Sequence, residues 1–184
     1  MLANMHKLWL GHTRKQVASV QAAMEAHDEV LALQEVATAC LLLVAETAAR
    51  QFIGEQACIA SIVRALTLAL DNNKQPACTP SANNRSRLIV SACGVLRAAV
   101  GGIKSDSHQA KHSIRAAAGG VDSLVRVLVE CAADEDAQAQ CCGAIKNACL
   151  SCDPNKKVAL QADGCAAMRP AAVPPLASMH ALTE

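Results

Sequence analysis

The chain has 184 residues, 52% of them hydrophobic, and its 17 Lys and Arg are offset by 16 Asp and Glu, giving a formal net charge of +1. This hydrophobic content is enough to bury a core and excludes a disordered tail. The scattered basic residues, with one Trp, one Phe and no Tyr, argue against a nucleic-acid partner, which would require a basic face or aromatic platforms for stacking bases.

The N-terminal part of the chain predicts two helices. Residues 1–15 carry no clear pattern and form a poorly defined segment. From Val17 onward, Val20 and Met24 mark a weak apolar stripe. Residues 33–45 follow as an Ala- and Leu-rich segment with little charge at its centre, which is typical of a helix packed on both sides by neighbours.

The middle of the chain predicts a helix, a loop and a second helix. A clear apolar stripe begins at Ile59 and continues at i+3, i+4 and i+7. Residues 71–85 predict an inserted loop, because they contain two Pro, four Asn and no apolar periodicity. Residues 86–100 again form an Ala-rich apolar helix.

The same order of elements returns in the next part of the chain. Gly119 and Gly120 predict a turn, since glycine adopts positive φ at little cost. The stripe that follows begins at Val121 with the spacing seen from Ile59, and residues 137–150 repeat the Ala- and Cys-rich helix.

The spacing of these segments indicates a repeat. Val17 and Ile59 are 42 residues apart, Ile59 and Val121 are 62 apart, and Val121 and Cys165 are 44 apart. The first and last intervals fall within the period of about 40–47 residues of helical repeats. The 71–85 loop and a longer connection at 101–107 account for the excess in the middle interval.

Residues 113–128, SIRAAAGGVDSLVRVL, resemble the Gly-containing entry to the second helix of an armadillo repeat. Residues 140–148, QCCGAIKNA, are similar to its third helix, and Asp153-Pro154-Asn155-Lys156 resembles the entry to a further repeat. The resemblance implies an all-α fold, a right-handed α-α superhelix of the armadillo-type solenoid. The paired-helix HEAT repeat is the structural alternative, and the Gly-Gly turn with its preceding helix favours armadillo.

The predicted array covers residues 16–168. It comprises a partial repeat at about 16–47, whole repeats at 48–103 and 106–151, and a partial repeat at 152–168. Residues 169–184 contain three Pro residues and are expected to form a tail. Because the ends of such an array lack polar caps, self-association through them is expected.

The resemblance also suggests a groove on the third helices. In armadillo proteins that bind extended peptides, a Trp and, four residues later, an Asn recur along this groove. The matching Trp positions are Thr38, Gly94 and Gly143, and the matching Asn positions are Leu42, Ala98 and Asn147. Only Asn147 carries the family's residue, so the usual mode of peptide binding is not expected.

Arg97 and Lys146 make the predicted groove mildly basic, which favours a partner with acidic side chains or a partner helix. The alternative is that both are solvated surface residues. The candidate partner-binding residues are Thr38, Arg97, Lys146 and Asn147.

The sequence predicts no catalytic, cofactor-binding or metal-binding residues. Cys149 and Cys152 form a CxxC motif without a second pair, and most of the ten cysteines lie in apolar helical patterns, where a thiol behaves as a small hydrophobe. This cysteine usage favours a cytoplasmic location, with the nucleus as an alternative. The basic start of residues 1–24 is weakly similar to an organellar transit peptide. No stretch is long and apolar enough to span a membrane, so no membrane partner is expected.

The expected function is therefore a non-catalytic protein–protein interaction module, a scaffold or adaptor. The alternative is a structural subunit packed within a larger multiprotein assembly.

Overall fold

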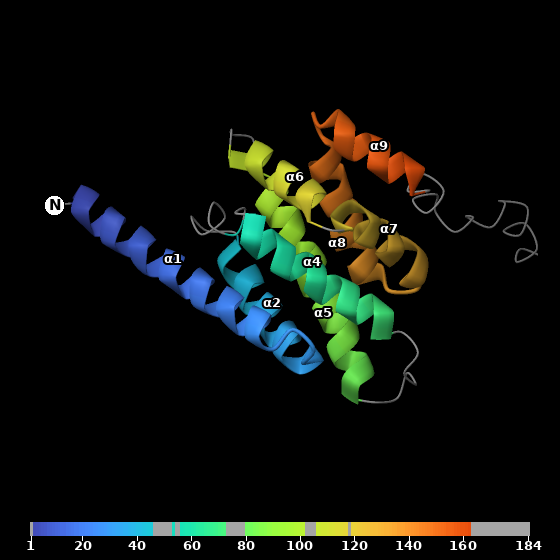
Figure 1. Ribbon diagram of the computed structural model, residues 1–184, viewed down its shortest axis with the longest axis horizontal. Coiled ribbons are helices and arrows are strands. Elements are labelled where there is room, and N and C mark those ends of the chain that lie inside the picture. The colour runs from blue at the N-terminus through green and yellow to red at the C-terminus, as the bar shows by residue number, and fades with distance from the viewer. Residues whose placement is uncertain are drawn as a thin grey trace, which may run out of the picture.

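The computed structural model describes residues 2–45, 53, 56–72, 80–101, 106–117 and 119–162, and every regular element in these ranges is a helix (Figure 1). The helices are α1 (Leu2–Ala26), α2 (Leu31–Ala45), α4 (Gln56–Asp71), α5 (Pro80–Val100), α6 (Asp106–Ala116), α7 (Gly120–Glu130), α8 (Glu135–Cys149) and α9 (Asp153–Gln161). The prediction of an all-α chain is confirmed for these residues.

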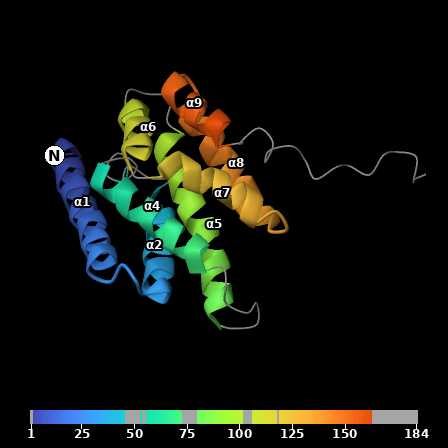
Figure 2. The same cartoon turned by 45° about the vertical axis from the view of Figure 1, so that its right-hand side comes forward.

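The helices pack in two rows (Figures 1 and 2). In one row α2 packs on α5 and α5 packs on α8; in the other, α1 packs on α4 and α4 packs on α7. The rows face each other, because α1 contacts α2, α4 contacts α5 and α7 contacts α8. The shorter helices α6 and α9 pack at the side, α6 against α4, α5 and α7, and α9 against α7 and α8.

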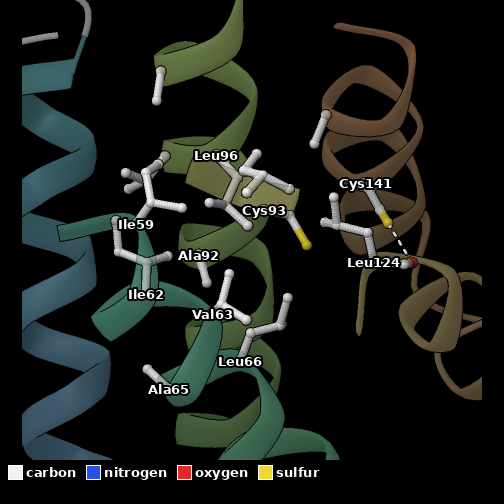
Figure 3. Packing of buried hydrophobic residues seen from close by; sticks show 14 of the residues in the cluster. Ile59, Ile62, Val63, Ala65, Leu66, Ala92, Cys93, Leu96, Leu124 and Cys141 are labelled. Atoms are coloured by element: carbon white, nitrogen blue, oxygen red, sulfur yellow. Dashed lines mark hydrogen bonds between the residues drawn. The ribbon is translucent and has the colours of Figure 1, made fainter. Parts of the chain in front are cut away.

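The core lies between the two rows (Figure 3). The stripe of α4 that begins at Ile59 is buried, as is the stripe of α7 that begins at Val121. Both predicted stripes are therefore confirmed as core faces. Leu96 of α5 and Leu124 of α7 are fully buried with them, and each such side chain contributes about 1.5–3 kcal/mol through loss of apolar surface from water. The thiol of Cys141 lies in this core and donates to the carbonyl oxygen of Leu124, 2.9 Å away.

One capping arrangement occurs at the ends of α1, α4 and α7. Gln34 of α2 donates its Nε2 to the carbonyl oxygens of Met24 and His27 at the end of α1. Arg85 of α5 donates its Nε to Ala69 near the end of α4. Gln138 of α8 donates its Nε2 to three carbonyl oxygens at the end of α7, those of Val127, Leu128 and Cys131. In each case a side chain from the following helix donates to carbonyl oxygens at the end of the preceding helix, where the backbone hydrogen-bond ladder stops. The oxygens of His27, Val127 and Cys131 also accept from a backbone N–H.

The turn before α7 requires both of its glycines. Gly119 has a φ of 74°, in the left-handed region that favours glycine. Gly120 lies so close to the carbonyl oxygen of Ile114 that a Cβ would overlap it. The prediction of a Gly-Gly turn is confirmed at this position.

Asn155 joins α9 to two other helices. Its side chain is fully buried, and its Nδ2 donates to the carbonyl oxygens of Ala148 in α8, at 2.9 Å, and Lys111 in α6, at 3.2 Å. Through Asn155, the segment that resembles a repeat entry therefore links α9 to α6 and α8 by buried hydrogen bonds.

Several predicted boundaries differ from the observed helices. Helix α1 begins at Leu2, so the expected boundary between residues 15 and 16 falls inside a helix. Helix α5 begins at Pro80 inside the expected 71–85 loop, because proline is well suited to the first position of a helix. Residues 73–79 of that loop and the expected tail at 169–184 lie outside the described residues. The division of the chain into repeats stays a prediction.

Candidate functional site

A groove of about 480 Å³ crosses the row formed by α2, α5 and α8. We call it the α2–α5–α8 groove. Its lining residues are Leu42, Leu43, Gly94, Arg97, Ala98, Gly101, Gln140 and Asn147. Of these described residues, only Arg97 is charged, so the groove combines apolar side chains with one cation and two amide side chains.

Two glycines allow the helices of this row to approach closely. A Cβ on Gly94 would lie 3.0 Å from Cδ1 of Leu42, and a Cβ on Gly143 would overlap the aliphatic stem of Arg97. Leu42 therefore lies over α5 at Gly94, and Arg97 lies over α8 at Gly143. These are the positions where the family places Trp, and the space a Trp would need is filled by the preceding helix.

The expectation that Thr38 contacts a partner is wrong for this structure. Thr38 is fully buried, and its hydroxyl donates to the carbonyl oxygens of Gln34 and Glu35 within its own helix. The reason is a shift of register. Leu42 and Arg97 occupy equivalent places in the row. Arg97 follows Gly94 by three residues, and the residue three before Leu42 is Ala39, which is half-exposed. The small residue of α2 that corresponds to Gly94 and Gly143 is thus Ala39.

Arg97 and Asn147 both line the groove. Arg97 is exposed, whereas Asn147 donates its Nδ2 to the carbonyl oxygen of Arg97 across 3.1 Å. This bond ties α8 to the last turn of α5. Because an amide nitrogen has two hydrogens, one donor and the amide oxygen of Asn147 remain for other contacts.

Lys146 does not line the groove with Arg97. It is exposed and lines a second, mainly apolar pocket of about 330 Å³ between α8 and α9. We call this the α8–α9 pocket. Its other lining residues are Cys142, Ile145, Cys149, Lys156, Ala159 and Leu160. The two cations expected to share one surface therefore belong to two different ones.

Gln140 also lines the groove, although it is not among the residues predicted from the sequence. Gln140 precedes Asn147 by seven residues, two turns of a helix, so both side chains lie on the same face of α8. This spacing could have predicted that Gln140 lies beside Asn147. The Ala- and Cys-rich composition of the segment instead indicated a helix packed on both sides.

A polar pocket of about 590 Å³ was also missed, where the start of α5 meets the turn between α7 and α8. Ser86 donates its hydroxyl to the carboxylate of Asp134, 2.6 Å away, and Asp134 also caps α8 by accepting from the backbone nitrogen of Ala137. Glu135 and Asp136 complete an acidic rim. The capping bonds give Asp134 a structural role here.

The cysteines of the CxxC motif are not arranged as an activated pair. Cys152 is buried and Cys149 is half-buried. Burial, followed by the neighbouring Cys152, raises the pKa of the Cys149 thiol, which disfavours the nucleophilic thiolate. Within the described residues, no group of three or more His, Cys, Asp or Glu is placed to hold a metal ion.

None of the helices in the described ranges is long and apolar enough to cross a bilayer. Comparison with protein-family models, with curated proteins and with solved structures found no match to this chain. The armadillo resemblance accordingly rests on the residues quoted above, and it stays an expectation.

Proposed function

We propose that this chain is a non-catalytic protein–protein interaction module built as a short armadillo-type solenoid. Two features support the solenoid. Helices of equivalent sequence character follow one another along each row, α2, α5 and α8 in one and α1, α4 and α7 in the other. The ends of α1, α4 and α7 are each capped by a side chain of the following helix, as a repeating unit would produce.

The observation that carries the binding proposal is the α2–α5–α8 groove with Arg97 as its single charge. Leu42, Leu43 and Ala98 offer apolar contacts, and the guanidinium of Arg97 offers paired donors to a carboxylate. The proposed occupant is a peptide or helix of a partner protein that carries an Asp or Glu next to an apolar side chain. Gln140 and Asn147 would bond its polar backbone or side-chain groups.

Selection of peptides from a displayed random library tests this proposal. The purified chain is expected to enrich peptides with an acidic residue beside a Leu, Ile or Val. Arg97→Glu should weaken binding of the enriched peptides at least about tenfold, because a charge-assisted pair is replaced by repulsion.

Arg115→Glu is the matched control, since Arg115 is an exposed arginine of α6 that bonds His112 outside the groove. Its variant should bind like the parent chain. Enrichment of basic peptides, or equal loss of binding in both variants, would contradict the proposal.

A second candidate function is a structural subunit of a larger assembly. It is favoured by large apolar side chains exposed on α2, where Val36 is 59% and Leu43 80% exposed. Surface of this kind usually marks an interaction site when it is contiguous.

A further inference from the structure

Helix α2 presents an apolar stripe on the side opposite its buried residues. Val36, Ala39, Cys40 and Leu43 follow the spacing i, i+3, i+4, i+7, which places them on one face of the helix. Val36, Cys40 and Leu43 are exposed and Ala39 is half-exposed. Among the described residues, α2 thus has neighbours on its buried side and an open apolar stripe on the other side, at the first position of its row.

The last position of the same row carries the second open apolar surface, the α8–α9 pocket. Cys142, Ile145 and Cys149 of α8 form its floor with Ala159 and Leu160 of α9, and Leu160 is 59% exposed. The two surfaces lie at opposite ends of the α2–α5–α8 row, with α5 between α2 and α8 (Figure 2).

The contacts within the row show how one helix receives the next. Leu42 of α2 lies over Gly94 of α5, and Arg97 of α5 lies over Gly143 of α8. By the same register Lys146 of α8 is the next side chain in this series, and Ala39 of α2 is the small residue that corresponds to the two glycines. The chain therefore carries Lys146 at one end of the row and the helix face around Ala39 at the other end. Within the row, a side chain at the first kind of position packs over a small residue at the second kind.

We propose that copies of this chain associate head to tail, with the α2 stripe of one copy packed on the α8–α9 pocket of the next. In that arrangement the stem of Lys146 crosses Ala39 of the neighbour, and Val36 and Cys40 fill apolar space at the pocket. The α2–α5–α8 row then continues from copy to copy. Because the two surfaces differ, the contact is heterologous and adds copies in one direction.

The proposal is tested on the full chain by two substitutions, one on each surface. Val36→Glu alters the α2 stripe and leaves the α8–α9 pocket intact; Leu160→Glu does the reverse. Both side chains are exposed and neither lines the α2–α5–α8 groove, so folding and groove binding should persist. Val129→Glu is the matched control, an apolar residue of α7 that is 62% exposed and lies outside both surfaces.

Sedimentation velocity over a hundredfold concentration range gives the readout. The parent chain and Val129→Glu should show a sedimentation coefficient that rises with concentration, whereas each of the other variants alone should stay monomeric. An equimolar mixture of Val36→Glu and Leu160→Glu should form a dimer, because each supplies the surface that the other has lost.

Four results would overturn the proposal. A parent chain that is monomeric throughout would mean that another segment or another protein covers these surfaces. Association retained by Leu160→Glu would indicate a symmetric α2 contact, and association retained by Val36→Glu a symmetric contact of the pocket. A mixture that remains monomeric would exclude the head-to-tail pairing. Arg97→Glu should leave all of these results unchanged, which separates this test from that of the groove.

Discussion

At the scale of single residues, the glycines of the chain serve different purposes, and alanine substitution separates them. Gly120→Ala places a Cβ against the Ile114 carbonyl and should lower the free energy of unfolding by about 2 kcal/mol or more. Gly119→Ala puts a side chain at a φ of 74° and should cost about 1 kcal/mol.

Gly11 supplies the matched control for these variants. It lies inside α1, and a Cβ there would meet nothing within 4 Å. Gly11→Ala should therefore stabilise the protein by about 0.5–1 kcal/mol through helix propensity alone. Urea unfolding followed by circular dichroism measures all three. A Gly120→Ala protein as stable as the parent would contradict the close approach of Gly120 to the carbonyl oxygen of Ile114.

The burial of some residues could be predicted from the sequence, and that of others could not. The stripes that begin at Ile59 and Val121 were predictable, because one apolar face alternates with a polar one. Thr38 was assigned to a surface and is buried, since α2 is apolar on nearly all sides and its sequence does not distinguish the core face from the open one. The pairing of Leu42 with Gly94, which sets the register, is visible only when two helices are seen together.

At the scale of elements, the glutamine caps at the ends of α1 and α7 should contribute more to the free energy of unfolding than exposed amide side chains do. Gln34→Met keeps the size and shape of the side chain but removes the donor that serves Met24 and His27. Gln138→Met does the same at the end of α7. Each should lower the free energy of unfolding by about 1 kcal/mol, because the amide's hydrogen bonds to these carbonyl oxygens are lost. Backbone N–H groups still serve the oxygens of His27 and Cys131.

Gln161→Met is the control for the caps, since Gln161 is an exposed residue at the end of α9. It should change stability by less than about 0.5 kcal/mol. Thermal unfolding of the three variants compares them directly. Equal, negligible effects would mean that water replaces the glutamine donors, and the caps would then be no support for a repeating unit.

The ends of elements were the least predictable part of the fold. The interior of α5 was predicted from its Ala-rich run, but its start at Pro80 was not, because the Asn and Pro residues around it are equally typical of a loop. Helix α1 was likewise predicted from Val17, although it begins at Leu2. Such boundaries depend on packing and capping partners supplied by other helices, which a local pattern does not contain.

At the scale of the whole molecule, the buried thiols couple stability to pH. A hydrogen bond with Cys93, followed by burial, raises the pKa of Cys141 far above its ordinary value near 9. Burial is also the main cause of the raised pKa of Cys131, Cys142 and Cys149. The folded chain thus holds these groups as neutral thiols at a pH where the unfolded chain releases their protons.

The direction of the effect follows from proton binding. Above pH 9 the unfolded state binds fewer protons than the folded state, so the free energy of unfolding falls as pH rises. Cys141 alone should contribute a loss approaching about 1.4 kcal/mol per pH unit. The chain has no Tyr to titrate in this range. Urea unfolding between pH 8 and 10.5, at protein concentrations low enough to keep the chain monomeric, should show a steady decline.

Substitution of single thiols assigns this decline to the core. Cys141→Ala should lower stability at pH 8, through lost packing, but should flatten the decline toward pH 10.5. Cys40→Ala removes an exposed thiol of α2 and should leave the slope at its parent value. A structural role for Cys141 alone would shift the whole curve without changing its slope. Parallel curves for all three proteins would therefore show that the thiol of Cys141 does not couple folding to alkaline pH.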